Sequence, residues 1–155
     1  MLKKNREMKK IAIGIQDFRE LITRNSYYVD KTKTIHNLLI SNKYYFLSRP
    51  RRFGKSLTLS MIKYLYMGEK ELFKNTYIYD KRNFEEINPV VYMSFASYNE
   101  FKDIEKFIKQ KLEIYIEDKI YNLEDFVDDF DLGYLAEKIY EKTGKQVVIL
   151  IDEYD

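Results

Sequence analysis

The sequence predicts an α/β fold in which a mostly parallel sheet is flanked by helices. Two observations lead to this prediction. A short hydrophobic segment at 44–47 leads, through a turn that ends in Gly-Lys-Ser at 54–56, into a helix-like segment. Five consecutive aliphatic residues at 147–151 are typical of a parallel strand buried on both faces, and they run directly into Asp152 and Glu153.

The remaining elements follow from hydrophobic spacing and from residues that begin and end helices and strands. Residues 1–10 form a basic start that we expect to be mobile. A second strand at 89–95 begins with Pro89, where a missing N–H does least harm. Gly68 and Gly144 are placed to end two helices, because helices commonly end at a glycine with positive φ. Helices are expected at 17–22, 31–39, 56–66, 101–116 and 134–142.

A strand, a tight turn ending in Gly-Lys-Ser and a helix form the phosphate cradle of P-loop NTPases. Backbone N–H groups and the helix N-terminus face the anion there. In such a cradle Lys55 reaches the β- and γ-phosphates, and Ser56 places its hydroxyl on Mg²⁺. The predicted phosphate-binding residues are Arg51, Arg52, Phe53, Gly54, Lys55, Ser56 and Leu57.

The cradle motif departs from its usual pattern at one position. In G-x-x-x-x-G-K-[ST] the first glycine falls at Arg49, so the loop lacks the residue that adopts positive φ without strain. On the tripeptide alone, an ordinary helix start capped by Ser56 is an equal alternative. Arg49, Arg51 and Arg52 either contact the nucleotide or pair with nearby carboxylates, and the sequence leaves both interpretations open.

The acidic pair after the 147–151 strand favours the phosphate-binding interpretation. Open α/β sheets bind ligands at the carboxyl ends of their strands. Asp152 is the expected Walker B residue, which holds Mg²⁺ through the water shell of the metal, and Glu153 is placed to polarise the attacking water. The predicted catalytic residues are therefore Lys55 and Glu153. The predicted metal ligands are Ser56 and Asp152, the alternative being an acidic pair that merely ends a strand at the surface.

With these motifs in place, the chain resembles the bacterial AAA-ATPase-like family, whose members usually carry a PD-(D/E)XK-type nuclease domain after the ATPase. The resemblance is carried by residues 13–18, 28–32, 46–56 and 151–155, and it covers the chain from about Ile11 onward. It implies that the Arg-Pro-Arg-Arg-Phe segment is itself the expected P-loop. It further implies one ATP- and Mg²⁺-binding domain over residues 11–155, in the cytoplasm of a bacterium.

The N-terminal motif precedes the expected P-loop strand, where related ATPases often place residues against the adenine base. Ile15, Phe18 and Tyr28 are the candidates for this wall, and Gly14 would allow the backbone to approach the base closely. An ordinary apolar lid over the sheet edge explains the same residues equally well.

The resemblance also implies a strand order, 5-1-4-3-2, that of the additional-strand class of P-loop NTPases. Strand 4 lies between the P-loop strand and the Walker B strand, and it follows the latter in sequence. We therefore expect an incomplete sheet in these 155 residues, with weak or no ATPase activity of the chain alone. Open strand edges favour a homodimer or association with a longer ATPase chain. The rival class is a non-catalytic interaction module that binds a full-length ATPase or another protein.

Composition excludes several other classes. The chain has no cysteine, which excludes disulfides and thiolate metal sites, and no apolar run approaches the length of a membrane span. His36 has no histidine or cysteine with which to share a metal, and the acidic residues at 124–131 lack EF-hand spacing. The net charge is only +2, so nucleic-acid binding is weakly supported; its candidates are Lys3, Lys4, Arg6, Lys9 and Lys10.

Overall fold

The computed structural model describes residues 9–41, 43–48, 50, 52–96, 98, 103–116 and 131–153. The chain divides into two compact units, residues 1–85 and 86–155, and each is described by itself. Of the predicted mobile start at 1–10, residues 1–8 lie outside the described residues, as do Arg49, Arg51 and the acidic residues at 124–130. Among the described residues, no helix is both long enough and apolar enough to cross a bilayer.

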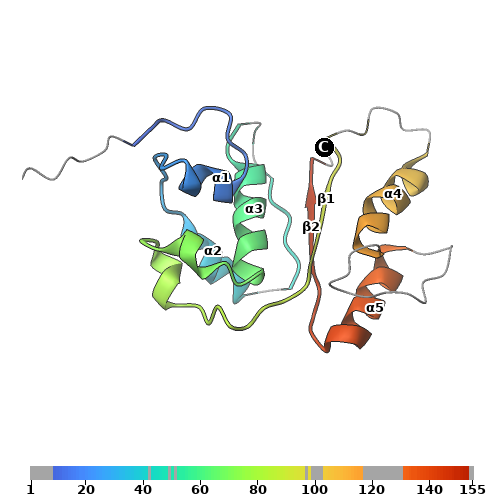
Figure 1. The fold of residues 1–155 in the computed structure, drawn as a ribbon. Helices are drawn as coiled ribbons and strands as arrows, with labels where there is room; N and C mark the ends of the chain where they lie inside the picture. Colours follow the sequence, from blue (N-terminus) through green and yellow to red (C-terminus); the bar gives the residue numbers. More distant parts are fainter. Residues whose placement is uncertain are drawn as a thin grey trace, which may run out of the picture. The chain divides into compact units, whose positions relative to one another are not determined.

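Unit 1 is built from short helices, and the helices predicted for it are confirmed (Figure 1). Its elements are α1 (Phe18–Thr23), α2 (Thr32–Leu39), α3 (Lys55–Tyr66) and the 3₁₀ helices η1 (Lys70–Phe73) and η2 (Tyr77–Asp80).

Aromatic rings form the centre of unit 1. Phe18 is fully buried, stacks on Phe73 with 5.0 Å between ring centroids, and meets Tyr28 edge-on at 5.2 Å. Offset and edge-on ring pairs of this kind add about 0.5–1.5 kcal/mol beyond the area that they bury. Leu65 of α3 is also fully buried. The apolar face of α3 is therefore held in the core of the unit.

Asp30 and Thr32 join the start of α2 to the start of η2. The Asp30 carboxylate accepts hydrogen bonds from the N–H of Thr32 at 2.8 Å and from the N–H of Tyr77 at 2.7 Å. The Thr32 hydroxyl accepts the N–H of Ile78 at 3.2 Å. Short helices leave many N–H groups without an intrahelical acceptor, and these two side chains supply acceptors for three of them.

The predicted P-loop strand at 44–47 is wrong. Residues 44–48 form no strand, and the side chains of Tyr44 and Phe46 are 92% and 75% exposed. A strand is stable only when a neighbouring strand takes its backbone hydrogen bonds, and the described residues offer it no such neighbour. A short apolar run was therefore not enough to predict a strand.

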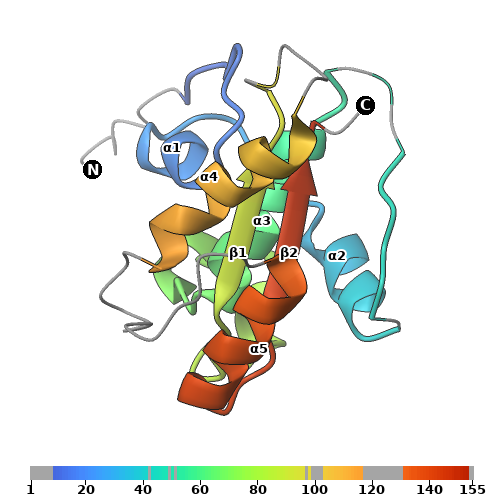
Figure 2. The same cartoon turned by 90° about the vertical axis from the view of Figure 1, so that its right-hand side faces the viewer.

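Unit 2 contains a parallel strand pair, β1 (Val90–Ser94) and β2 (Val148–Asp152), covered on one face by α4 (Ile104–Ile116) and α5 (Leu132–Thr143) (Figure 2). The register runs from Val90 opposite Val148 to Ser94 opposite Asp152. Both strands predicted for this unit are confirmed, and they are neighbours, as the predicted order requires. The prediction that the second strand is buried on both faces is wrong, because Ile149 and Ile151 are 40% and 39% exposed. Gly144 ends α5 with φ of +66°, also as predicted. The core between strands and helices consists of Val91, Met93, Leu112, Leu135 and Ile139.

The two outer edges of this strand pair differ. The Tyr115 hydroxyl of α4 accepts the N–H of Tyr92 at 2.7 Å and donates to the Tyr92 carbonyl at 2.9 Å, so it covers the free edge of β1. Val148 donates to Pro89, and the carbonyl of Asp152 accepts from Phe95, so alternate residues of β2 face β1. The backbone groups of Ile149 and Ile151 therefore face the other edge, where no described strand pairs with them.

The Asp30→Ala substitution should lower the free energy of unfolding by about 0.5–1.5 kcal/mol, because two backbone N–H groups lose their acceptor. Burial acts to raise the pKa of Asp30, but hydrogen bonds from the Thr32 hydroxyl and from the N–H groups of Thr32 and Tyr77 lower this pKa overall. The stabilisation is thus fully present above the unfolded pKa of about 3.9 and is lost as the pH falls through the lower folded pKa.

Urea unfolding of wild type and Asp30→Ala at neutral pH and at about pH 3 measures this difference. Asp80→Ala is the control, because Asp80 is an exposed carboxylate of η2. A difference between wild type and Asp30→Ala that stays constant over this pH range would contradict the assignment.

Candidate functional site

The start of α3 presents the features of an anion site. Gly54 is the N-cap residue with φ of +76°, and no side chain caps the helix. The first backbone bond of the helix runs from the Thr58 N–H to the Gly54 carbonyl at 3.0 Å. The first N–H groups of an α-helix have no acceptor within the helix, and they carry the positive end of its dipole. The alternative interpretation, a helix start capped by Ser56, is wrong, because Ser56 lies inside the first turn.

The loop before α3 holds a second residue in a left-handed conformation. Arg52 has φ of +68°, and Phe53 donates a backbone hydrogen bond to the Pro50 carbonyl at 3.4 Å. A residue with a Cβ in this region carries a strain of about 1–2 kcal/mol. Turns with left-handed residues direct successive N–H groups into one concave nest that binds anions. Arg49 and Arg51 lie outside the described residues.

Hydrogen bonds tie the N-terminal motif to α3. The buried Ser60 hydroxyl accepts the N–H of Phe18 at 2.9 Å and lies within hydrogen-bonding distance of the Gln16 carbonyl, at 3.3 Å. One turn further along α3, the Tyr64 hydroxyl donates to Asp17 at 2.8 Å. The 16–18 segment is therefore attached to the helix that begins at the Gly-Lys-Ser motif.

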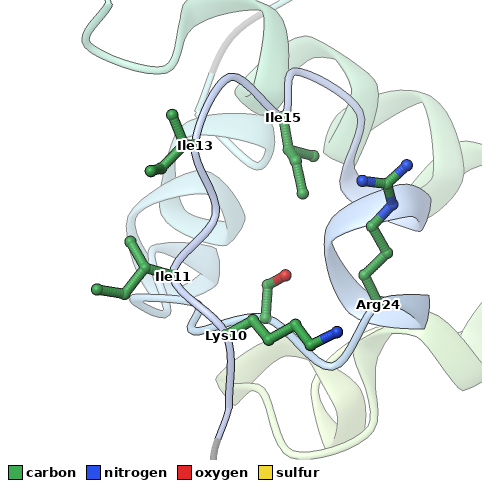
Figure 3. Close-up of a pocket in the computed structure, with 6 residues that line it drawn as sticks. Lys10, Ile11, Ile13, Ile15 and Arg24 are labelled. Atoms are coloured by element: carbon green, nitrogen blue, oxygen red, sulfur yellow. The ribbon is translucent and has the colours of Figure 1, made fainter.

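A pocket of about 430 Å³ opens beside this segment (Figure 3). Its volume lies in the range of small-molecule sites. The side chain of Ile15 points into it, Lys10 and Arg24 border it, and Ile11 and Ile13 point away from its centre. Ser26 also lines it; this residue is buried, and none of the described residues hydrogen-bonds its hydroxyl. The pocket thus combines one aliphatic side chain that points inward, one hydroxyl and two bordering cations.

Two predicted base contacts have core positions. Phe18 is fully buried between Tyr28 and Phe73 and exposes no ring surface. Tyr28 is half-buried, and its hydroxyl donates to the Met61 sulfur at 3.2 Å. Burial raises the pKa of Tyr28 to about 12, so this hydroxyl stays protonated at neutral pH. Of the three candidates, Ile15 alone lines the pocket.

In unit 2, Asp152 ends β2 as a buried carboxylate. It is 4% exposed, and both of its oxygens accept hydrogen bonds, from the Tyr92 hydroxyl at 2.9 Å and from the Glu153 N–H at 3.0 Å. Within unit 2, no described lysine, arginine or histidine forms an ion pair with it. A buried carboxylate without a cationic partner is costly, and a bound cation removes that cost. The donor set is hard oxygen, which fits Mg²⁺.

Glu153 follows in an unusual conformation. Its φ is +52°, and its side chain is exposed. The described residues contain no group of three His, Cys, Asp or Glu side chains able to hold a metal. A cation at Asp152 would therefore take its remaining ligands from hydroxyl groups, phosphates or water.

Comparison with known proteins gives a family match that includes both the Gly-Lys-Ser motif and the Asp152-Glu153 pair. Residues 12–155 match the family described as "Predicted AAA-ATPase". The chain belongs to this family. A relative from Azotobacter chroococcum mcd 1, described as an uncharacterized protein in the vnfD 5' region, is 35% identical over 150 residues. The match covers 95% of this chain but only 29% of that relative, so the chain spans less than a third of its length. No solved structure matches this AAA-ATPase-like chain.

Sequence reasoning missed the residues that support the motifs of this AAA-ATPase-like chain. Three side chains form hydrogen bonds with partners 42 to 60 residues away in the sequence: Ser60, Tyr64 and Tyr92. No local sequence pattern indicates such pairs. Arg24 and Ser26 were missed because the pocket forms only when the backbone at Lys10 pairs with that at Ser26, and no sequence pattern indicates this pairing. Asp131 of the acidic segment caps α5, accepting the Tyr134 N–H at 2.7 Å.

Gly54→Ala should lower the free energy of unfolding by about 1–2 kcal/mol, because alanine is strained at φ of +76° although no atom crowds the added Cβ. Arg52→Gly should have the opposite effect, up to about 1 kcal/mol, since glycine relieves the strain at φ of +68°. Urea unfolding of the two variants measures both effects. Changes of equal sign would show that the left-handed conformations are not the cause.

Proposed function

We propose that this chain is the ATP-binding domain of an AAA-ATPase-like protein, which binds Mg-ATP and, in its complete form, hydrolyses it. The observation that supports this most directly is the start of α3, where a left-handed Gly54 and uncapped N–H groups coincide with the Gly-Lys-Ser motif. Membership of the predicted AAA-ATPase family supports the same function.

The phosphates would lie on the backbone of residues 51–57, with the Lys55 ammonium on the β- and γ-phosphates. Ser56 and Asp152 would hold Mg²⁺, the first by its hydroxyl and the second by its carboxylate. The metal would supply charge neutralisation of the phosphates. Glu153 would orient and polarise the attacking water, a role that an exposed carboxylate after the Walker B position can fill.

The adenine base would occupy the pocket lined by Ile15. Phe18 and Tyr28 would support this wall from the core, and Ser26 would offer its hydroxyl to a polar edge of the base. We further propose, on the resemblance, a P-loop NTPase fold, a cytoplasmic location and a nuclease domain of the PD-(D/E)XK type in the whole protein. The greater length of the Azotobacter relative supports a larger whole protein.

Thermal unfolding with and without Mg-ATP tests the proposal. At about 100 times its dissociation constant, ATP should stabilise the fold by about 2.7 kcal/mol, and Lys55→Ala should remove most of this gain. Lys63→Ala is the matched control, since it removes the same charge from the last turn of α3. An identical response of wild type and Lys55→Ala to ATP would refute the phosphate cradle.

The open edge of β2 favours a second candidate function, that of a non-catalytic interaction module. Ile151 is 39% exposed, and its backbone groups face the edge that no described strand covers. Such an edge pairs with strands of other chains. The occupant could be a second copy of the chain or a longer ATPase.

If this edge mediates association, Ile151→Lys should lower the apparent mass in light scattering at high concentration, because an edge lysine opposes strand pairing. Tyr140→Lys, on the exposed side of α5, is the control and should leave the mass unchanged. A wild-type chain that is monomeric at every concentration would exclude self-association through β2.

A further inference from the structure

The Ser60 hydroxyl makes an unusually dense set of contacts for one small side chain. It accepts the Phe18 N–H at 2.9 Å, and its own proton can reach the carbonyl of Leu57 at 3.0 Å or that of Gln16 at 3.3 Å. Ser60 is 5% exposed, so water does not replace these bonds when they are lost. The hydroxyl therefore fixes the backbone on both sides of Asp17.

A second polar contact holds the same segment one turn further along α3. Asp17 accepts the Tyr64 hydroxyl with one oxygen at 2.8 Å and the Glu20 N–H with the other at 2.9 Å. The guanidinium of Arg19 lies 4.7 Å from the centre of the Tyr64 ring and pairs with Glu69 at 2.6 Å. The segment is thus bonded to α3 at two successive turns of the helix.

These bonds connect the pocket with the start of α3. Ile15, which points into the pocket, immediately precedes Gln16 (Figure 3). Ser60 lies about 7.5 Å along the helix axis from Lys55, at about 1.5 Å per residue. One nucleotide could therefore reach both the Ile15 wall and the first turn of α3.

We propose that Ser60 is a positioning residue for the nucleotide base. By holding Gln16 and Phe18 against α3, it sets the distance and angle between the Ile15 wall and the phosphate cradle, so that base and phosphates contribute together to binding. This inference rests on the proposed ATP-binding function and extends it. The role of Ser60 then differs from that of Lys55, because Ser60 affects binding of the base and Lys55 binds only the phosphates.

Ligands with and without a base distinguish positioning from general stability. Calorimetric titrations with Mg-ATP and with magnesium tripolyphosphate, an inorganic triphosphate chain, compare the two parts of the site. In wild type, ATP should bind more tightly than tripolyphosphate. Ser60→Ala should weaken ATP binding by about 10-fold and leave tripolyphosphate binding unchanged.

Tyr64→Phe is an independent second variant and should act in the same direction, because it frees Asp17 from α3. Thr23→Ala is the control; it removes a hydroxyl from the exposed end of α1 that bonds only to the Arg19 and Glu20 carbonyls of the same helix. Equal losses for both ligands, or no loss of ATP affinity in either α3 variant, would overturn the inference.

The remaining outcomes separate this inference from the proposed function. If wild type binds ATP and tripolyphosphate equally, the phosphate site is supported but the base contributes nothing to binding. Ser60 then has no positioning role. If wild type binds neither ligand, the proposed function fails and the inference fails with it.

Discussion

The hydrogen bond from the Phe18 N–H to the Ser60 hydroxyl joins α1 to α3 in the core of unit 1, where both residues are buried. Phe18 begins α1, so its N–H has no acceptor within that helix, and Ser60 supplies one from α3. The same backbone position places the Phe18 ring against Phe73 and Tyr28. Leaving a buried N–H unsatisfied costs about 1–3 kcal/mol, so the ring packing and the polar contact depend on each other.

Two of the strained backbone positions among the described residues lie in the sequence motifs. Four described residues other than glycine have positive φ, and two of them are asparagines, which adopt this conformation readily. The other two are Arg52 and Glu153, one in the Gly-Lys-Ser loop and one directly after the buried Asp152. Strain of this kind concentrates where a backbone is held for function rather than for stability.

Hydrophobic patterning predicted all the α-helices and both strands of the described sheet, because those signals are local to each element. It failed at 44–47, since a strand also requires a partner that no local pattern reveals. The motif residues around Gly54 and Asp152 could be named from spacing alone. Their supports, Ser60, Tyr64 and Tyr92, could not, because they meet their partners only after the chain has folded.

Tyr115 makes the two outer edges of the strand pair differ in their capacity to accept another strand. The Tyr115 hydroxyl bonds both backbone groups of Tyr92 and so covers the middle of the outer edge of β1, whereas no described strand or side chain covers the outer edge of β2. A further strand, whether from this polypeptide or another, would meet free backbone groups beside Ile149 and Ile151. β2 would then be an interior strand of the sheet, and Asp152 at its end would have a neighbouring strand on both sides.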